Sequence, residues 1–86
     1  MKSKATGKFW AGYRQLPVEV RKIAAKQHRL WLKDPSHPSL KFKKVQDFWS
    51  CRVTDSFRAL GVMDGDTVVW FWIGSHSEYE RLIKRR

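Results

Sequence analysis

A chain of 86 residues with 18 lysine and arginine residues against 8 aspartate and glutamate residues carries a formal net charge of +10. This length holds one small domain, residues 1–86, and a single cysteine excludes an internal disulfide, which fits a reducing cytoplasm. The longest apolar run, residues 68–73, is far shorter than the roughly 20 residues of a membrane-spanning helix, so we expect neither a membrane segment nor a signal peptide.

The positive charge indicates a polyanionic partner. An excess of this size attracts anions over about a Debye length, ~8 Å at physiological salt. Nucleic acid is the first expectation. An acidic protein would satisfy the same field, and a third interpretation is that the basic residues serve only solubility.

The first half of the chain is expected to be helical. Residues 1–5 are short and basic and are expected to fray. Thr6 is placed to cap a helix over residues 7–15. Pro17 suits the first turn of a second helix, which is expected to end at Asp34-Pro35. Residues at helical spacing form the inward stripe of this second helix: Val20, Ile23, Ala24, Gln27, Leu30 and Trp31. A basic stripe on another side is interpreted as an ordinary solvated face: Lys22, Lys26, Arg29 and Lys33.

The second half is expected to form a sheet. A short basic strand over residues 40–43 precedes three antiparallel strands, over residues 49–54, 57–63 and 67–73. Trp49, Cys51 and Val53 alternate with polar residues and predict one face of the first strand, and Asp64-Gly65 predicts a hairpin turn. The third strand is β-branched and aromatic almost throughout, so we expect it to be central and covered on both faces.

A last helix is predicted from the capping-box spacing of Ser75 and Glu78. Basic residues suit its C-terminal end: Arg81, Lys84, Arg85 and Arg86. The expected fold class is therefore α+β, with an N-terminal helical hairpin packed on a small, mainly antiparallel four-stranded sheet and a short C-terminal helix.

No motif in the sequence indicates a metal or a cofactor. It contains no Gly-rich phosphate loop, no GxSxG elbow, no CxxC pair and no two histidines at metal-ligand spacing. Cys51 is interpreted as an apolar filler, and His28 and His37 as structural or solvated. His76 differs, because it lies in the first turn of the last helix, where the helix dipole and basic neighbours favour a neutral imidazole that can relay a proton.

The remaining charged residues match the needs of metal-free RNA cleavage. That reaction requires a base near the ribose 2′-hydroxyl, an acid near the leaving 5′-oxygen and cations around the phosphate. Arg52 and Arg58 offer guanidinium groups, and His76 and Tyr79 follow the third strand. The basic strand offers lysines that could bind RNA: Lys41, Lys43 and Lys44. The alternative for the arginines is that they pair with nearby acids: Asp47, Asp55 or Glu78.

The order of helix, helix, basic strand, three-strand meander and short C-terminal helix resembles the RelE/ParE superfamily of bacterial type II toxins over nearly the whole chain. FWSCRVTDSFRALGVMDGD resembles the core of that family, and FWSxRVTxxxR with a later histidine resembles the YoeB-type mRNA interferases. GSHSEYERL is similar to the histidine-bearing tail of YafQ-like members.

The resemblance implies roles for four residues. Arg58 matches the arginine that stabilises the scissile phosphate, and His76 matches a catalytic histidine of the YoeB-like and YafQ-like branches. Arg52 matches a basic residue that RelE uses, and Tyr79 is similar to a C-terminal aromatic group.

Two positions depart from the family pattern. Pro38 falls near where the YoeB branch carries a glutamate base, and Ser50 falls where RelE carries a lysine. The identity of the general base therefore stays open, with His76 as the candidate.

The resemblance implies a metal-independent, ribosome-dependent mRNA endonuclease without a small-molecule cofactor, neutralised by an antitoxin with an acidic or amphipathic segment. ParE-type members share the fold and are described as poisoning DNA gyrase without cutting RNA, so a gyrase inhibitor is the second hypothesis. A basic nucleic-acid-binding domain without catalysis is the third.

Overall fold

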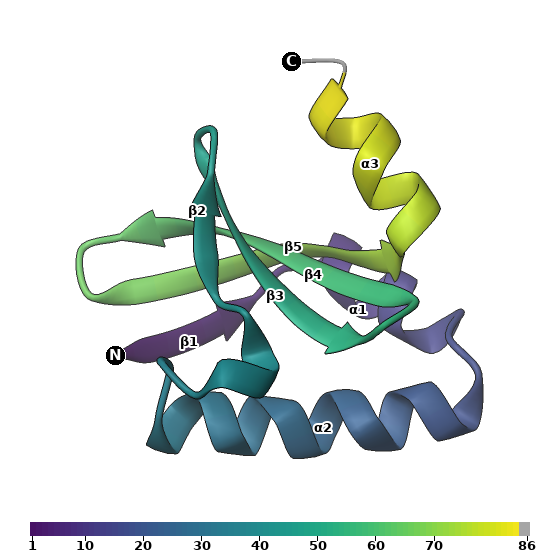
Figure 1. Ribbon diagram of the computed structural model, residues 1–86, viewed down its shortest axis with the longest axis horizontal. Coiled ribbons are helices and arrows are strands. Elements are labelled where there is room, and N and C mark those ends of the chain that lie inside the picture. The colour runs from purple at the N-terminus through teal and green to yellow at the C-terminus, as the bar shows by residue number, and fades with distance from the viewer. Residues whose placement is uncertain (85–86) are drawn as a thin grey trace.

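The computed structural model describes residues 1–84; Arg85 and Arg86, expected at the basic end of the last helix, lie outside the described residues. Its elements follow in the order β1 (Lys2–Ala5), α1 (Gly7–Arg14), α2 (Val18–Lys33), a 3₁₀ helix (Pro38–Leu40), β2 (Lys43–Val45), β3 (Phe48–Thr54), β4 (Phe57–Asp64), β5 (Thr67–Ser75) and α3 (His76–Lys84) (Figure 1).

The strands form one five-stranded sheet in the order β1-β5-β4-β3-β2. The predicted antiparallel meander β3-β4-β5 is confirmed, and β2 pairs antiparallel with β3. The sheet is mixed because β1 pairs parallel with β5. The α+β class is therefore confirmed, with five strands in place of the predicted four.

The N-terminal segment is ordered as an edge strand, so the prediction that residues 1–5 fray was wrong. The N–H of Lys2 donates to the Asp66 carbonyl at 2.8 Å, and the N–H of Thr6 donates to the Trp70 carbonyl at 2.9 Å. The side chain of Ser3 adds a third tie, because its Oγ accepts a hydrogen bond from Trp70 Nε1 at 3.0 Å. These contacts join residues more than sixty positions apart, which explains why no local pattern predicts them.

The β4–β5 hairpin turns one residue later than predicted. Asp64 still pairs with Thr67, so the two loop residues are Gly65 and Asp66. Gly65 has a φ of +63°, which a residue without a β-carbon adopts at little cost.

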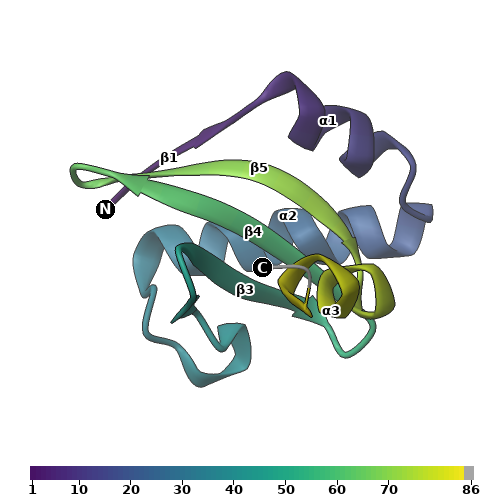
Figure 2. The same cartoon turned by 90° about the horizontal axis from the view of Figure 1, so that it is seen from above.

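The helices cover both faces of the sheet. In Figures 1 and 2, α2 runs along one face and α3 stands over the other. As predicted, Thr6 caps α1, its side chain accepting from the Phe9 N–H. Helix α1 packs on β5 and approaches it closely at Gly12, where a β-carbon would lie 2.9 Å from the Ile73 carbonyl oxygen. Helix α2 packs on β3, and Pro17 precedes it as the N-cap instead of lying in its first turn.

The core lies between α1, α2 and the sheet. Trp31 of α2 is 1% exposed and meets Trp70 of β5 edge to face, with ring centroids 5.6 Å apart. The predicted inward stripe of α2 is correct for Trp31 and wrong for Ile23, which is 41% exposed. The core residues are Leu16, Trp31, Leu40, Cys51, Val53, Ala59, Val68, Trp70 and Ile73.

The predicted basic strand begins three residues later than expected. Leu40 ends the 3₁₀ helix and is fully buried, and Lys41 takes a left-handed conformation with a φ of 43°. This turn lets both Leu40 and Phe42 reach the core, and Phe42 stacks on Trp49 with ring centroids 4.8 Å apart. The alternation of apolar and basic residues over positions 40–43 therefore reflects a turn between the 3₁₀ helix and β2, not a strand.

Strand β5 lies inside the sheet, paired on both edges, although β4 and not β5 is the middle strand. Its side chains are buried or half-buried on both faces, as predicted.

Candidate functional site

Arg52 and Arg58 are direct cross-strand partners on β3 and β4. Residues opposite each other in register point to the same face, so both arginines share the face of Ser50 and Leu60, which α3 covers in part. The prediction that Arg52 shares a face with hydroxyl groups is confirmed. The pairing brings together two of the four predicted site residues.

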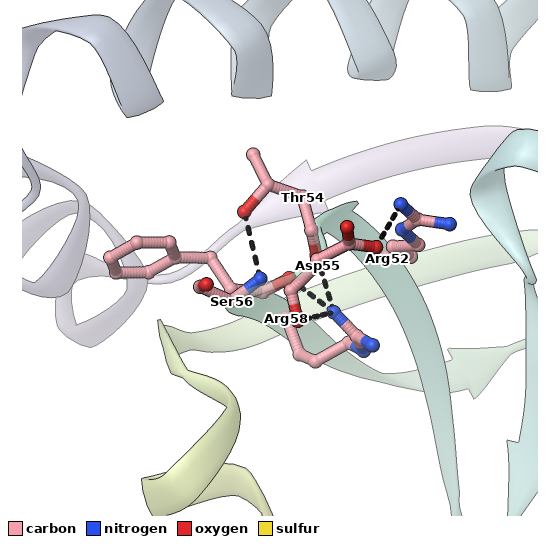
Figure 3. Close-up of polar contacts among 6 residues, drawn as sticks. Arg52, Thr54, Asp55, Ser56 and Arg58 are labelled. Atoms are coloured by element: carbon pink, nitrogen blue, oxygen red, sulfur yellow. Dashed lines mark hydrogen bonds and ion pairs between the residues drawn. The ribbon is translucent and has the colours of Figure 1, made fainter.

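Both guanidinium groups contact the β3–β4 turn (Figure 3). The turn is shaped locally by Thr54, whose Oγ1 accepts the Ser56 N–H at 3.1 Å. Arg52 Nη2 forms an ion pair with the Asp55 carboxylate, as the surface-pairing alternative predicted. Arg58 donates from Nη1 to the carbonyl oxygens of Thr54, Asp55 and Phe57, at 3.3 Å for Asp55 and 2.9 Å for Phe57.

His76 begins α3 against the same turn. Its backbone N–H donates to the Ser56 carbonyl at 2.7 Å. Its imidazole Nε2 lies 3.4 Å from a carboxylate oxygen of Glu80, one helical turn later, and its ring centroid lies 5.8 Å from that of Tyr79. The sequence predicted basic neighbours for this ring, whereas within residues 1–84 the charged group in contact with it is the carboxylate of Glu80.

The turn therefore joins the predicted site residues in two ways. Arg52 and Arg58 reach it with their side chains, His76 reaches it with its backbone, and Tyr79 follows through its contact with the His76 ring. The structure describes no direct contact between the imidazole and either guanidinium group. Two hollows of the described chain, one between α1, α2 and the sheet and one between α1 and the end of β5, are lined by residues other than these four.

The three candidate lysines do not form one row. Lys43 lies opposite Ser50 and so on the face of the two arginines, whereas Lys44 lies opposite Trp49 on the face that α2 covers. Lys41 precedes the strand. All three are exposed.

Helix α3 is fixed at both ends over the arginine face. At its start one of the two bonds of the predicted capping box is present, since the Glu78 N–H donates to Ser75 Oγ at 3.2 Å. The Glu78 carboxylate accepts from the Ser75 hydroxyl at 3.1 Å and not from the Ser75 backbone N–H. Near its end Gln46 Nε2 donates to the Ile83 carbonyl at 3.0 Å. Sequence reasoning missed Gln46 and Glu80. Glu80 was detectable from its spacing of four from His76, and Gln46 had no local signal because its partner is 37 residues away.

The other candidate groups have structural surroundings. Burial raises the pKa of the Cys51 thiol to about 12, while the charge of Arg58 acts in the opposite direction. His37 Nδ1 accepts the Ser39 N–H at 3.2 Å and so caps the 3₁₀ helix. Much of His28 is exposed, but desolvation of the side that stacks on Trp31 lowers its pKa.

Residues 1–84 were also searched for metal-binding clusters and membrane-spanning helices. In that range no three or more His, Cys, Asp or Glu side chains gather at metal-binding distance. No helix in the part of the chain that the structure describes combines the length and the apolar character needed to cross a membrane.

Solved toxin structures share this fold. A chain of the RelB-RelE antitoxin-toxin complex from Methanococcus jannaschii superposes with a TM-score of 0.73 at 14% identity, covering 92% of this chain and 96% of that chain. The YoeB/ParE toxin from Agrobacterium tumefaciens gives 0.69 at 18% identity, covering 88% and 99%. A RelE toxin mutant from E. coli in the free state gives 0.66 at 18% identity, covering 98% and 95%.

The family is assigned by a match between the sequence and a family model. No curated protein matches it significantly. The family model for a ParE-like toxin domain matches residues 18–81. Because that match spans most of the chain and the fold agrees with it, the protein belongs to the ParE-like toxin domains of the RelE/ParE superfamily of type II toxins.

Proposed function

We propose that this toxin is a metal-independent endonuclease that cuts mRNA on the ribosome and so inhibits translation. The observation that supports this proposal is the gathering of Arg52, Arg58 and the start of α3 on one turn of a protein with a net charge of +10. Two guanidinium groups on one sheet face match the needs of a phosphodiester.

Arg58 is suited to hold the scissile phosphate. All three of its hydrogen bonds within residues 1–84 leave from Nη1. A guanidinium group carries five N–H donors, so Nε and Nη2 can form a bidentate fork to phosphate oxygens while Nη1 keeps the group oriented. Such preorganised donors stabilise the charge that builds on the phosphorane transition state.

Arg52 can join that phosphate by exchanging its partner. Its present acceptor, Asp55, is 89% exposed, and an ion pair that open to water contributes little. A dianionic transition state is the stronger competitor for the guanidinium group.

His76 is the candidate for the proton transfers. In a transphosphorylation the ribose 2′-oxygen attacks phosphorus, its proton passes to a base, and an acid protonates the departing 5′-oxygen. Glu80 can orient the imidazole through Nε2, and Tyr79 beside it can stack on a base or donate its hydroxyl proton. Lys41, Lys43 and Lys44 would contact the flanking RNA phosphates.

The proposed partner is an antitoxin with an acidic or amphipathic segment, and the proposed compartment is the cytoplasm. The M. jannaschii relative was crystallised as an antitoxin-toxin complex, and so was the E. coli RelBE pair. The charge of +10 on this chain supports an acidic partner.

Gyrase inhibition is the second candidate, and one observation favours it. The family model that matches is that of a ParE-like toxin domain. The resemblance of the sequence to ParE-type toxins implies action on DNA gyrase without RNA cleavage.

A paired assay tests the proposal. The purified toxin is added to a reconstituted translation reaction with one defined mRNA, whose 5′ ends are mapped by primer extension, and separately to gyrase with relaxed plasmid. We expect new 5′ ends within the reading frame, their loss with His76→Gln, and unchanged supercoiling. Lys33→Gln, which removes one positive charge from the end of α2, is the matched control and should cut normally. Intact mRNA together with blocked supercoiling would support the gyrase hypothesis, and failure of both assays would leave simple nucleic-acid binding.

A further inference from the structure

Asp55, in the β3–β4 turn, contacts both arginines of the candidate site (Figure 3). Its carboxylate forms the ion pair with Arg52, and its backbone carbonyl oxygen accepts from Arg58 Nη1 at 3.3 Å. The side chain of Arg52 is 28% exposed and that of Asp55 is 89% exposed, so the carboxylate lies on the solvent side of the pair. An anion that approaches Arg52 from solvent therefore meets this carboxylate first.

The two arginines carry like charges at directly opposite positions of β3 and β4. Like charges so placed destabilise a sheet, and an anion close to them offsets the repulsion. Asp55 supplies such an anion from within the chain, one negative charge beside two positive ones. The pair of arginines therefore keeps an excess of positive charge, while one of its guanidinium groups is already engaged by a carboxylate.

The shape of the turn does not depend on this carboxylate. Thr54 Oγ1 accepts the Ser56 N–H at 3.1 Å and so provides the side-chain hydrogen bond of the turn, whereas the carboxylate of Asp55 is directed at Arg52. Asparagine suits turns as well as aspartate does. We therefore expect Asp55→Asn to remove the charge and leave the turn intact.

The carboxylate competes with any phosphate that the site binds. A carboxylate and a phosphodiester each carry one negative charge and form similar bonds to a guanidinium group. Exposed ion pairs are weak, so the competition should reduce the affinity for a phosphodiester by about twofold to fivefold without abolishing it. The transition state of cleavage carries more negative charge than the diester and displaces the carboxylate more readily. The competition therefore acts mainly against the uncut diester.

We propose that Asp55 is a specificity-determining residue of the toxin, whose carboxylate competes with RNA phosphates for Arg52 and so weakens the hold on RNA that is not being cut. This inference rests on the proposed nuclease function, because it concerns how the same site distinguishes two states of its substrate. The alternative is that Asp55 serves only the fold, by offsetting the charges of the two arginines.

A neutral variant of nearly the same shape tests the proposal. Binding of a short fluorescein-labelled 2′-O-methyl RNA, which cannot be cut through its blocked 2′-oxygen, is followed by fluorescence anisotropy at physiological ionic strength. We expect Asp55→Asn to bind this RNA about twofold to fivefold more tightly than the parent toxin.

Asp64→Asn is the matched control, because it also removes one exposed negative charge. Asp64 lies six positions along β4 from Arg58, roughly 20 Å at about 3.3 Å per residue. That separation exceeds the Debye length of ~8 Å, so this variant should bind the RNA as the parent does.

A double mutant separates competition for Arg52 from simple repulsion of the RNA. If the carboxylate acts by engaging Arg52, most of the gain from Asp55→Asn should be lost in an Arg52→Gln background, where no guanidinium group remains to be released. A carboxylate that only repelled RNA would give the same gain in both backgrounds.

Three results would each overturn the proposal: no gain in affinity from Asp55→Asn, an equal gain from Asp64→Asn, or a gain that Arg52→Gln does not diminish. The same variants in the translation reaction keep this inference apart from the proposed function. Normal mRNA cutting without a gain in affinity would reject the role of Asp55 and retain the nuclease. The expected gain together with intact mRNA would retain the competition for phosphate and reject the nuclease.

Discussion

Arg52 and Arg58 look equivalent in the sequence but have different structural roles. Arg58 is half-buried and satisfies carbonyl oxygens of the β3–β4 turn, whereas Arg52 meets one exposed carboxylate. Activity lost on truncating Arg58 would therefore mix chemistry with folding.

The first prediction compares these two residues in urea unfolding. We expect Arg58→Ala to lower the free energy of unfolding by about 1–3 kcal/mol, because it removes charge-assisted hydrogen bonds to carbonyl groups. Arg52→Ala should cost less than about 1 kcal/mol, because its partner is exposed. Equal losses in the two variants would contradict the structural role of Arg58.

The second prediction concerns Cys51. Since burial raises its thiol pKa to about 12, the group stays protonated at neutral and mildly alkaline pH, and only the thiolate reacts. We expect Ellman's reagent to label the native protein no faster than the protein unfolds, and to label it at once in guanidinium chloride. Rapid labelling of the folded protein at pH 8 would show that the thiol is reachable.

Residue roles were predictable where chemistry is local. The spacing of Arg52 and Asp55 predicted an ion pair as one alternative, and the spacing of Ser75 and Glu78 predicted the cap that the Ser75 hydroxyl provides. The carbonyl partners of Arg58 were not predictable, because a side chain that bends back onto the next turn leaves no pattern in the sequence.

At the scale of the element, β1 is a strand that local sequence patterns do not predict. Its four residues, KSKA, carry little apolar character, and its partner strand is at the other end of the chain. The meander was predictable because alternation and turn chemistry act between neighbours. The boundary of β2 was missed because Lys41 turns left-handed and ends the 3₁₀ helix before the strand begins.

The third prediction tests how β1 is held. Ser3→Ala removes the acceptor of Trp70 Nε1, an indole on a side chain that is 5% exposed. Leaving a buried donor unpaired should lower the free energy of unfolding by about 1–3 kcal/mol. Ser77→Ala, at an exposed position in α3, is the control and should stay within about 0.5 kcal/mol of the parent. A Ser3→Ala loss no larger than that of the control would mean that β1 is held by its backbone alone.

The fourth prediction uses the contact between β1 and α2. The pKa of His28 is lowered in the folded protein, so below its ordinary value of 6.5 the unfolded chain binds more protons than the folded one. Its contribution to stability is fully present above pH 6.5 and is lost as the pH falls from there through the lowered folded pKa. His28→Gln should therefore show a smaller loss of unfolding free energy between pH 7 and pH 5 than the parent. Parallel pH profiles for the two proteins would contradict this assignment.

At the scale of the whole molecule, the fold assigns the family of the protein but not its activity. The arrangement of helices and sheet, with the family match over residues 18–81, assigns the toxin family. Fold alone does not choose between a nuclease and a gyrase inhibitor, since one scaffold carries both activities. That choice depends on whether Arg52, Arg58 and His76 act on one phosphodiester.

The fifth prediction tests that choice in cells. The toxin and its His76→Gln variant are expressed under tight control, and mRNA 5′ ends are mapped across the transcriptome during growth arrest. We predict abundant new 5′ ends inside translated reading frames with the parent protein, and neither these ends nor arrest with His76→Gln at the same protein level. Intact transcripts in cells that the parent protein has arrested would contradict the account.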